Sequence, residues 1–576
     1  MSMFNSFAES VPSKMYKLRN DAQEDMFSTS DIDMIDTCLL ASNGAIYIMK
    51  KVYGPADYTS VAAPAHISKT NLVLQYAIYN GSSETGDYMK LNYYAYLKAM
   101  KSRFTLFLPS DEAMQYYYDP VSMASQKPAV LALAYDEKIK DDSKFPITYR
   151  LYRYDKTTGV RGTAYANEKA EDDDVVNRLK DILESHTIVH DGTNPIDSED
   201  EFYLTKNGSA IKVTRDANNT IIRVQGGFQL ENERKINQGT LTPGSEMRGA
   251  SEVSVLASNT HNLDNGRTYV LDDAPIIPAT TSVYGILTED TSYANPFREF
   301  FDLTQYSEEV IVGCGLVDDK LADTQKKSLL KKYKTFVDDG GVDQNVQFFN
   351  NYNYTLFAPD NAAIQAAIAN GLPTWESIID DYESLKDSDN VAHLTAKDSL
   401  RLQTKITYLN NFIRVHFLDN SVFADKTAKD ETDYVTSSYD DSLGVFVKVH
   451  VERVAEGAGT ALKVRDDMKN AAGNLTSPQF DVNDSYKNLM ARDVRCVKDG
   501  KAKSPKDQLS MNGITIQGSS FAVVHLINGT LKHTDKMPDF SNMHDCKRYL
   551  KRYPIYRGAR DEQARMMLKQ SMQKRY

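Results

Sequence analysis

The sequence predicts an α+β protein built from tandem copies of one unit. Two observations lead to this fold class: a strand that runs through a proline turn into a helix occurs twice, and a hairpin-like segment occurs three times in the 576 residues. A chain of this length is expected to fold as several domains, and apolar residues, at 41% of the sequence, suffice for ordinary cores. The repeated segments therefore define the expected domain organisation.

The first repeated element is a strand that ends at a proline and runs into a helix. It is RFTLFLPSDEAMQYYY around Pro109 and NYTLFAPDNAAIQAAIANG around Pro359. Thr and Phe favour a half-buried strand, and each proline ends its strand because it cannot donate to the ladder. Ser110 and Asp360 then stand where a side chain can cap the exposed amides of a helix. Both copies have the pattern aromatic-Thr-Leu-Phe-apolar-Pro.

The second repeated element is an apolar helical stretch that runs into a histidine and then into an apolar strand. It is DILESHTIVHD around His186 and YLNNFIRVHFLDNSVFAD around His416. A single histidine in such apolar surroundings favours a buried, hydrogen-bonded core residue.

The third repeated element is a short strand beside an Asn-Gly pair, which supplies the backbone angles of a tight hairpin turn. LLASNGAIYIMKKVYGP contains Asn43 and Gly44, and LASNTHNLDNGRTYVLDDAPIIP contains Asn265 and Gly266. A third segment, GSSFAVVHLINGTLKHTD, matches more weakly, because its Gly518 comes before the strand.

The order of these elements resembles the fasciclin domain family. Domains of that family open with a TLFAPTNxAF-like motif, continue with an LLxYHVV-like motif and close with an NGxIHVIDxVLLP-like hairpin. The resemblance covers most of residues 70–535. The matching motif positions are Phe104, Leu106, Phe107, Pro109, Phe357 and Pro359 in the opening strands, and Asn43, Gly44, Asn265 and Gly266 in the hairpins.

The resemblance implies tandem fasciclin-like domains, each a β-sandwich or wedge with flanking α-helices. Two such domains, with insertions, are expected at residues 66–279 and 292–535. Residues 1–60 are then the C-terminal part of a truncated repeat, because they hold a closing hairpin without an opening strand. Residues 536–576 form a basic C-terminal extension, with ten Lys/Arg and three Asp/Glu from Ser541 onward.

Two further expectations concern the connections and the first hairpin. The proline-containing segments Pro55–Pro64 and Pro278–Tyr284 are predicted to be linkers between repeats. The first hairpin strand, Ile46–Met49, is apolar on both faces, which is typical of a strand covered on both sides. Without an opening strand it would leave an unpaired edge and an apolar patch, and this predicts self-association.

The resemblance also implies a function. It predicts a non-enzymatic adhesion or binding protein of the cell surface, secreted or anchored outside the cell. The tyrosine-rich, Asn/Asp-rich repeats with long insertions are most similar to fasciclin-type lipoproteins of Bacteroidota, which implies a lipid anchor in the outer membrane. The alternative is a glycan- or protein-binding accessory of an outer-membrane nutrient-uptake system. The expected partner is an extracellular protein, a glycan surface or a membrane protein.

Members of the family use the middle motif in adhesion, and this makes His186 and His416 candidate binding residues. The tyrosine that precedes this histidine in the family is replaced by Ser185 in one copy and by Val415 in the other. A buried core role for both histidines therefore stays open beside the binding role.

Composition and motifs argue against several other classes. A net charge of −12 disfavours a nucleic-acid partner. The chain has no run of about 18 apolar residues, so no transmembrane helix is expected, and Met1–Asn20 lacks the apolar core of a signal peptide. The four cysteines are far apart, which indicates neither a zinc site nor a disulfide framework. With no catalytic or cofactor-binding motif, we expect no catalytic residue, metal or cofactor, and an enzyme is the least favoured class.

Overall fold

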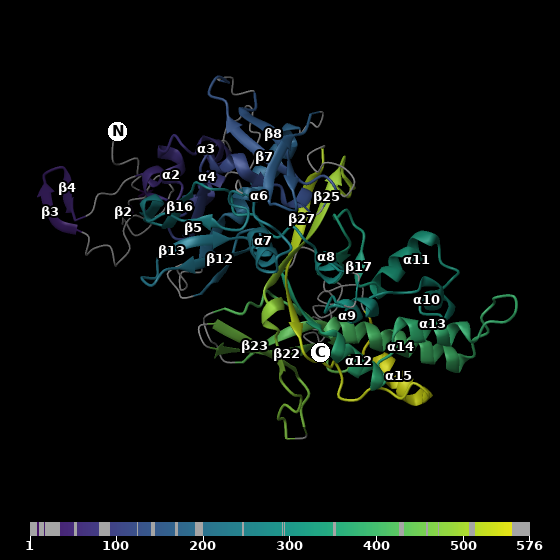
Figure 1. Cartoon of the computed structure of the whole chain (residues 1–576). Coiled ribbons are helices and arrows are strands. Elements are labelled where there is room, and N and C mark those ends of the chain that lie inside the picture. The colour runs from purple at the N-terminus through teal and green to yellow at the C-terminus, as the bar shows by residue number, and fades with distance from the viewer. Residues whose placement is uncertain are drawn as a thin grey trace.

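The computed structural model of the chain has an α+β fold, which confirms the predicted fold class (Figure 1). Helices and strands occur together in both halves, which we name the first lobe (residues 55–279) and the second lobe (residues 280–555). The structure describes residues 9–10, 16–17, 35–50, 55–79, 93–123, 125–139, 144–166, 171–190, 200–244, 247–290, 292, 294–349, 353–425, 431–456, 459–470, 472–505 and 513–555.

Two small hairpins precede the first lobe. β1 (Glu9–Ser10) pairs with β2 (Tyr16–Lys17), and β3 (Ile35–Ala41) pairs with β4 (Gly44–Met49). In Figure 1 the hairpin β3–β4 stands apart from both lobes. Within the described part of the chain, no third strand joins its sheet.

The first lobe contains three four-stranded sheets. Their strand orders are β10-β5-β16-β15, β11-β12-β13-β14 and β6-β7-β8-β9. The strands are β5 (Arg103–Pro109), β6 (Tyr117–Tyr118), β7 (Ala129–Tyr135), β8 (Ile147–Asp155), β9 (Val160–Ala164), β10 (Thr187–His190), β11 (Phe202–Leu204), β12 (Ala210–Arg215), β13 (Ile221–Gln225), β14 (Val253–Ser254), β15 (Thr260–Leu263) and β16 (Gly266–Leu271). The helices are α1 (Ala56–Thr59), α2 (Ala63–Ile67), α3 (Leu72–Tyr79), α4 (Tyr93–Leu97), η2 (Ala113–Tyr116), α5 (Pro120–Met123), α6 (Asp172–Ser185), α7 (Gly227–Asn237) and η3 (Ala257–Asn259).

The second lobe is organised around one nine-stranded sheet of order β24-β23-β22-β21-β20-β19-β27-β25-β26, beside the small pair β17-β18. Its strands are β17 (Phe336–Val337), β18 (Asn345–Val346), β19 (Tyr354–Pro359), β20 (Phe417–Asp419), β21 (Thr432–Asp440), β22 (Val445–Glu456), β23 (Gly459–Asp466), β24 (Phe480–Asp481), β25 (Leu489–Lys498), β26 (Lys501–Ala502) and β27 (Thr515–Ile527). Its helices are α8 (Val283–Leu287), α9 (Arg298–Leu303), α10 (Glu308–Gly313), α11 (Asp323–Leu330), η4 (Lys331–Tyr333), α12 (Asn361–Ala369), α13 (Trp375–Glu383), α14 (Ala396–Val415), η5 (Asp484–Tyr486) and α15 (Met543–Arg552).

Three central strands are arranged in the same way in both lobes. In each lobe the strand of the opening motif lies between an antiparallel strand that follows the histidine and a parallel strand from the closing motif. Strand β27 thus takes the place of β16, although its sequence matches the closing motif only weakly. The corresponding register pairs are Thr187–Leu106 and Tyr269–Phe107 in the first lobe, and Phe417–Leu356 and His525–Phe357 in the second.

The two opening strands, β5 and β19, are buried on both faces, which explains their nearly continuous apolar sequences. In the first lobe Phe107 packs against the sheet β11–β14, whereas Leu106 packs against the helices on the opposite face. In the second lobe Phe357 packs against valines of β22 and β23, and Leu356 packs beneath the helices. Each lobe therefore has two cores, one on either side of its central strands.

The predicted helix start after the proline is confirmed in the second lobe. The Asp360 carboxylate accepts a hydrogen bond from the Ala363 amide at 2.7 Å, and the nine-residue helix α12 follows. In the first lobe the Ser110 hydroxyl accepts from the Ala113 amide at 3.3 Å, and only a four-residue 3-10 turn follows. The aromatic residues after that turn continue as β6 instead, in keeping with their preference for strands.

Both expected linkers are packed segments and not extended spacers. Pro55–Pro64 forms α1 and the start of α2, and Val61 is buried in the first core. Pro278–Tyr284 is also held in place, since Val283 is buried and the Thr281 carbonyl accepts a hydrogen bond from a main-chain amide of β25. Proline favours the first turn of a helix as well as an extended spacer, and composition alone did not separate these outcomes.

The described part of the basic extension, up to residue 555, is folded against the second lobe. Helix α15 packs on α14 and buries Cys546 and Tyr549. Residues 556–576, which contain most of the predicted basic tail, lie outside the described residues.

Candidate functional site

The two histidines of the middle motif occupy equivalent places in the two lobes. His186 follows α6 and His416 follows α14, where each helix gives way to a central strand, and both are buried. His186 Nδ1 donates to the Ile182 carbonyl at 2.7 Å, and its Nε2 accepts from the Ile276 amide at 2.8 Å. A carbonyl on one side and an amide on the other select the neutral ring with its proton on Nδ1.

His416 repeats this pattern with its own neighbours. Its Nδ1 donates to the Phe412 carbonyl at 2.8 Å, and its Nε2 accepts from the Leu531 amide at 3.0 Å. Burial lowers the pKa of His186 to about 4 and that of His416 to about 3, so both rings are neutral near pH 7. Each histidine ties a helix end to the segment after the closing strand. A direct role of these rings in binding stays a prediction.

Asn265 and Gly266 hold the closing hairpin of the first lobe against the opening strand. The side chain of Asn265 is buried. Its Oδ1 accepts a hydrogen bond from the main-chain amide of Val61 at 2.8 Å, and its Nδ2 donates to the Leu97 carbonyl at 2.7 Å. Gly266 has φ of +150°, and a Cβ at this position would lie 1.9 Å from the Phe104 carbonyl oxygen. Only glycine allows this approach between the strands.

An open cleft of about 920 Å³ lies at the C-terminal ends of the parallel strands β5 and β16. Helices α1 and α2, the segment before α3, the turn after β5 and the hairpin β15–β16 enclose it. Its lining side chains include Tyr58, Ile67, Lys69, Asp111, Glu112, His261 and Asp272. None of these residues was singled out from the sequence, because they come from segments far apart in the chain that only the fold brings together.

The cleft combines an apolar platform with polar groups of both signs. Tyr58 is 46% exposed and Ile67 is 62% exposed, which is high for large apolar side chains. Lys69 and His261 are exposed in the same cleft. Asp272 accepts a hydrogen bond from the Asn259 side chain at 2.6 Å, which fixes the carboxylate at the rim. The arrangement suits a ligand that has one apolar face and several hydroxyl groups.

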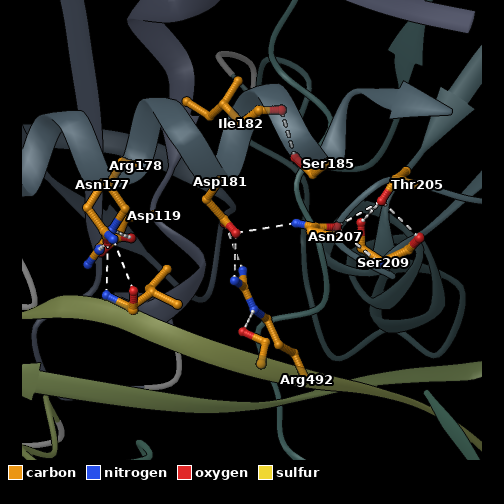
Figure 2. Close-up of polar contacts among 12 residues, drawn as sticks. Asp119, Asn177, Arg178, Asp181, Ile182, Ser185, Thr205, Asn207, Ser209 and Arg492 are labelled. Atoms are coloured by element: carbon orange, nitrogen blue, oxygen red, sulfur yellow. Dashed lines mark hydrogen bonds and ion pairs between the residues drawn. The ribbon is translucent and has the colours of Figure 1, made fainter. Parts of the chain in front are cut away.

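The second lobe reaches the first through a ribbon formed by β25 and the first half of β27, which lies beside α6 (Figure 1). Val494, Cys496 and Ile514 of the ribbon segment pack on Val121 of α5. Next to this apolar contact, the Arg492 guanidinium makes two hydrogen bonds to the Asp181 carboxylate, at 2.9 and 2.8 Å (Figure 2).

Further polar contacts extend along α6. The Asn177 side chain donates to the Ile516 carbonyl at 3.0 Å and accepts from the Ile516 amide at 2.9 Å, so it pairs with the ribbon as another strand would. Beneath it, Arg178 donates to the Asp119 carboxylate at 2.8 Å, and both side chains are fully buried (Figure 2). We call the buried histidine at the end of α6 or α14, His186 or His416, the histidine corner of its lobe. Helix α6 thus ends at one histidine corner and contacts the second lobe along its side.

A second contact joins the lobes away from the ribbon. The rings of Phe202 and Phe423 stack with centroids 4.6 Å apart, and the Asp425 carboxylate accepts from the Glu201 and Phe202 amides at 2.7 and 3.1 Å. Further contacts join the lobes elsewhere, among them a hydrogen bond from the Asn353 side chain to the Gly208 carbonyl and an ion pair of Arg234 with Glu289. With several separated contacts, the lobes are fixed relative to each other. Sequence reasoning missed this interface, although the arginines that interrupt β25 are an unusual feature for a strand beside a core.

The cysteines and the acidic and histidine side chains of the described residues do not form a further candidate site. Cys38, Cys314, Cys496 and Cys546 are all free thiols, and only Cys38 is exposed. In the described ranges, no cluster of three or more His, Cys, Asp or Glu residues is placed to hold a metal ion. No helix in those ranges is long and apolar enough to cross a membrane.

Comparison with known proteins gives little support beyond the structure itself. No family model matches the chain, and no curated protein matches it. Among solved structures, the chain is similar to a FAS1 domain pair from the insect cell adhesion molecule Fasciclin I, with 11% sequence identity, 80% of this chain and 96% of that chain covered, and a TM-score of 0.20. A TM-score this low does not establish a common fold, so the duplicated architecture stands on its own contacts.

Proposed function

We propose that the protein is a non-enzymatic binding protein of the cell surface, built from two fasciclin-like domains, with the hairpin β3–β4 as part of a third. The observation that carries the proposal is the duplicated central arrangement of opening strand, histidine corner and closing strand. Its three motifs occur in the order that the fasciclin resemblance requires, and they are built with the same register in both lobes. The domain limits that the resemblance gives, 66–279 and 292–535, then lie within the first and the second lobe.

The fixed arrangement of the lobes supports a binding role. Two domains held rigidly present their surfaces at one spacing, so two weak contacts with the same partner can combine into a stronger one. The acidic net charge of −12 suits a protein or glycan partner better than a nucleic acid. We place the protein outside the cell, lipid-anchored in the outer membrane in its full-length form, as for the bacterial surface lipoproteins that its sequence resembles.

The cleft of the first lobe favours the second candidate, a glycan-binding accessory of a nutrient-uptake system. Tyr58 and Ile67 offer an apolar surface on which a sugar ring can stack, and Asp272, Lys69 and His261 offer hydrogen-bonding groups around it. Three carboxylates line the cleft, and each already has a partner in the protein: Asp111 accepts from the amides at the start of α3, Glu112 pairs with Arg248, and Asp272 accepts from Asn259. We therefore expect the glycan to be bound and not cleaved.

Binding of the full chain to a printed glycan array and to immobilised extracellular proteins tests both candidates. We expect Tyr58→Ala to weaken glycan binding by a factor of roughly ten or more if the cleft is the site. Val391→Ala, an equally exposed apolar position (52%) on the second lobe, is the matched control. Binding to proteins that Tyr58→Ala leaves unchanged would favour the adhesion role. Release of shorter glycans during incubation would contradict both candidates and indicate an enzyme.

A further inference from the structure

Arginine and tyrosine side chains alternate along the sheet β6–β9 of the first lobe. The Arg161 guanidinium of β9 lies over two rings, with its central carbon 4.3 Å from the ring centroid of Tyr116 and 4.5 Å from that of Tyr152. Arg248 lies over the ring of Tyr116 at 5.1 Å, and Arg150 lies over the ring of Tyr152 at 5.5 Å. We call these five residues the arginine–tyrosine row.

The guanidinium groups of the row keep hydrogen-bond donors at their edges. A guanidinium stacked on an aromatic ring presents its face to the ring, and its N–H groups lie in its own plane. Arg161 donates from Nη1 to the Gln115 carbonyl at 2.9 Å, and Arg150 contacts only a ring among the described residues. Arg150 is exposed, and the other members of the row are half-buried. The row therefore holds arginines whose donors are not used up within the described structure.

Carboxylates are scarce along the row, although the chain has 79 Asp and Glu against 67 Lys and Arg. Of the three arginines, only Arg248 has a carboxylate partner in the described part of the chain, Glu112 at 2.9 Å. On the sheet surface of the second lobe, by contrast, Arg465 of β23 is paired with Glu431 at 2.6 Å. In an acidic protein, arginines left without carboxylates indicate that the negative charge comes from a ligand.

The row begins at the cleft of the first lobe. Arg248 pairs with Glu112 and donates to the Asp272 carbonyl at 2.8 Å, and both of these residues line the cleft. Arg150 on β8 is the far end of the row. One ring separates each arginine from the next, so neighbouring arginines lie within about 10 Å of each other. This spacing suits acidic groups on separate units of a chain better than the single charge of a small ion.

We propose that the arginine–tyrosine row binds the carboxylates of an acidic glycan, a chain that contains uronic acid, while another part of the same chain occupies the cleft. The inference rests on the glycan-binding role proposed above and names the class of glycan. The planar fork of arginine matches a carboxylate with two parallel hydrogen bonds. A nucleic acid requires a broad basic surface, which a net charge of −12 disfavours, whereas a glycan with separated charges requires only a short row.

Binding of the full chain to fluorescent oligogalacturonate, which has a carboxylate on each ring, tests the proposal by fluorescence anisotropy. The same oligosaccharide with its carboxylates reduced to alcohols is the matched neutral probe. We expect the acidic probe to bind tighter by a factor of roughly ten or more, and this difference to shrink in high salt, which screens exposed charges. Equal binding of the two probes would overturn the proposal and leave the glycan-binding role intact. Binding of neither would also overturn it, and the glycan array described above then decides the glycan-binding role separately.

Arg150→Gln removes an exposed guanidinium and should leave the melting temperature unchanged. We expect it to weaken binding of oligogalacturonate by a factor of roughly three to ten and to leave binding of the reduced probe unchanged. Arg153→Gln is the matched control. Arg153 is exposed on the same strand and lies over the ring of Tyr165 at 4.4 Å, but its pairing with β7 places it on the opposite face of the sheet from Arg150. Equal loss in the two variants would overturn the proposal, because it would show attraction by overall charge.

Arg161→Lys tests whether the stacked guanidinium matters beyond its charge. Lysine keeps the charge and loses the planar fork, so we expect Arg161→Lys to weaken binding of oligogalacturonate nearly as much as Arg161→Gln. Undiminished binding by Arg161→Lys would overturn the proposed role of the row. A single-stranded oligonucleotide of equal charge should compete poorly. If it displaced oligogalacturonate at equal concentration, the row would be a nucleic-acid site and the proposal would be wrong.

Discussion

The two lobes share their central strands and differ in how far the closing hairpin extends. In the first lobe β15 and β16 have four and six residues, whereas β25 and β27 in the second lobe have ten and thirteen. The additional length forms the ribbon that lies along α6. The motif residues thus build the same central strands twice. The longer closing hairpin, β25–β27, extends beyond the second lobe and contacts the first, whereas the shorter hairpin β15–β16 stays within its own lobe.

The largest expected effect tests the equivalence of the two cores. Phe107→Ala and Phe357→Ala should each lower the free energy of unfolding by about 3–5 kcal/mol, because both rings are fully buried and stacked, on Tyr269 and on His525. Chemical denaturation of the two variants measures this. Leu256→Ala, at an exposed position, is the control. A large effect in only one lobe would break the comparison.

The next effect concerns the ribbon, which only the second lobe has. Arg492→Ala should destabilise the chain by about 3 kcal/mol, because it leaves the Asp181 carboxylate without its partner in a mostly buried place. The double variant Arg492→Met with Asp181→Leu should recover most of this loss. Denaturation of the single and double variants, together with hydrogen exchange at Ile516, gives the result. An effect below about 0.5 kcal/mol would show that the ribbon contact is not held by this pair.

The histidine corners predict a dependence of stability on pH. In the folded state the pKa of His186 is about 4 and that of His416 about 3, against an ordinary value of 6.5. The unfolded chain therefore binds protons that the folded chain excludes, and stability falls as pH falls from about 6.5 toward about 4.

Urea denaturation at about pH 7 and about pH 4.5 measures this loss. The variant His186→Gln should reduce the loss between the two pH values, even if it is less stable at both. His416→Gln should do the same, and exposed His261→Gln should not. Burial raises the pKa of Asp493 to about 6, which acts in the opposite direction, but this contribution is common to every variant. An unchanged pH dependence in both histidine variants would contradict the buried neutral corner.

The smallest expected effect distinguishes the two helix starts. Asp360→Ala should cost about 1 kcal/mol, because it removes the cap of a nine-residue helix. Ser110→Ala should cost clearly less, since its bond is 3.3 Å long and only a four-residue turn follows. Thermal unfolding of both variants checks the order. Equal costs would show that Ser110 stabilises the first lobe in another way.

Much of the core could be predicted from the sequence, because the interactions that build it are local. The pattern aromatic-Thr-Leu-Phe-apolar-Pro favours a strand that ends at its proline, and in both lobes the structure has such a strand with its phenylalanine, Phe107 or Phe357, buried. The two proline-containing segments were predicted to be extended spacers, and this prediction failed because their structure depends on residues distant in the chain. Pro55 and Pro278 allow either a spacer or a packed segment, and neighbours distant in the chain decided for packing.

The candidate site could not be predicted in the same way. Tyr58, Glu112 and His261 have no pattern that links them along the chain, and they line one cleft only because β5 and β16 end side by side. The lobe interface has the same character, since Asp181 and Arg492 are paired across a sequence separation of 311 residues.

By itself, the sequence determined the repeated unit, its strands and turns, and the apolar character of both faces of β4, since these follow from residue type and short-range spacing. Only the tertiary structure decided the neutral state of the two histidines, the ribbon on α6 and the cleft. Each of these depends on which group faces which across a large distance in sequence, and burial and strand pairing set that relation after the local elements have formed.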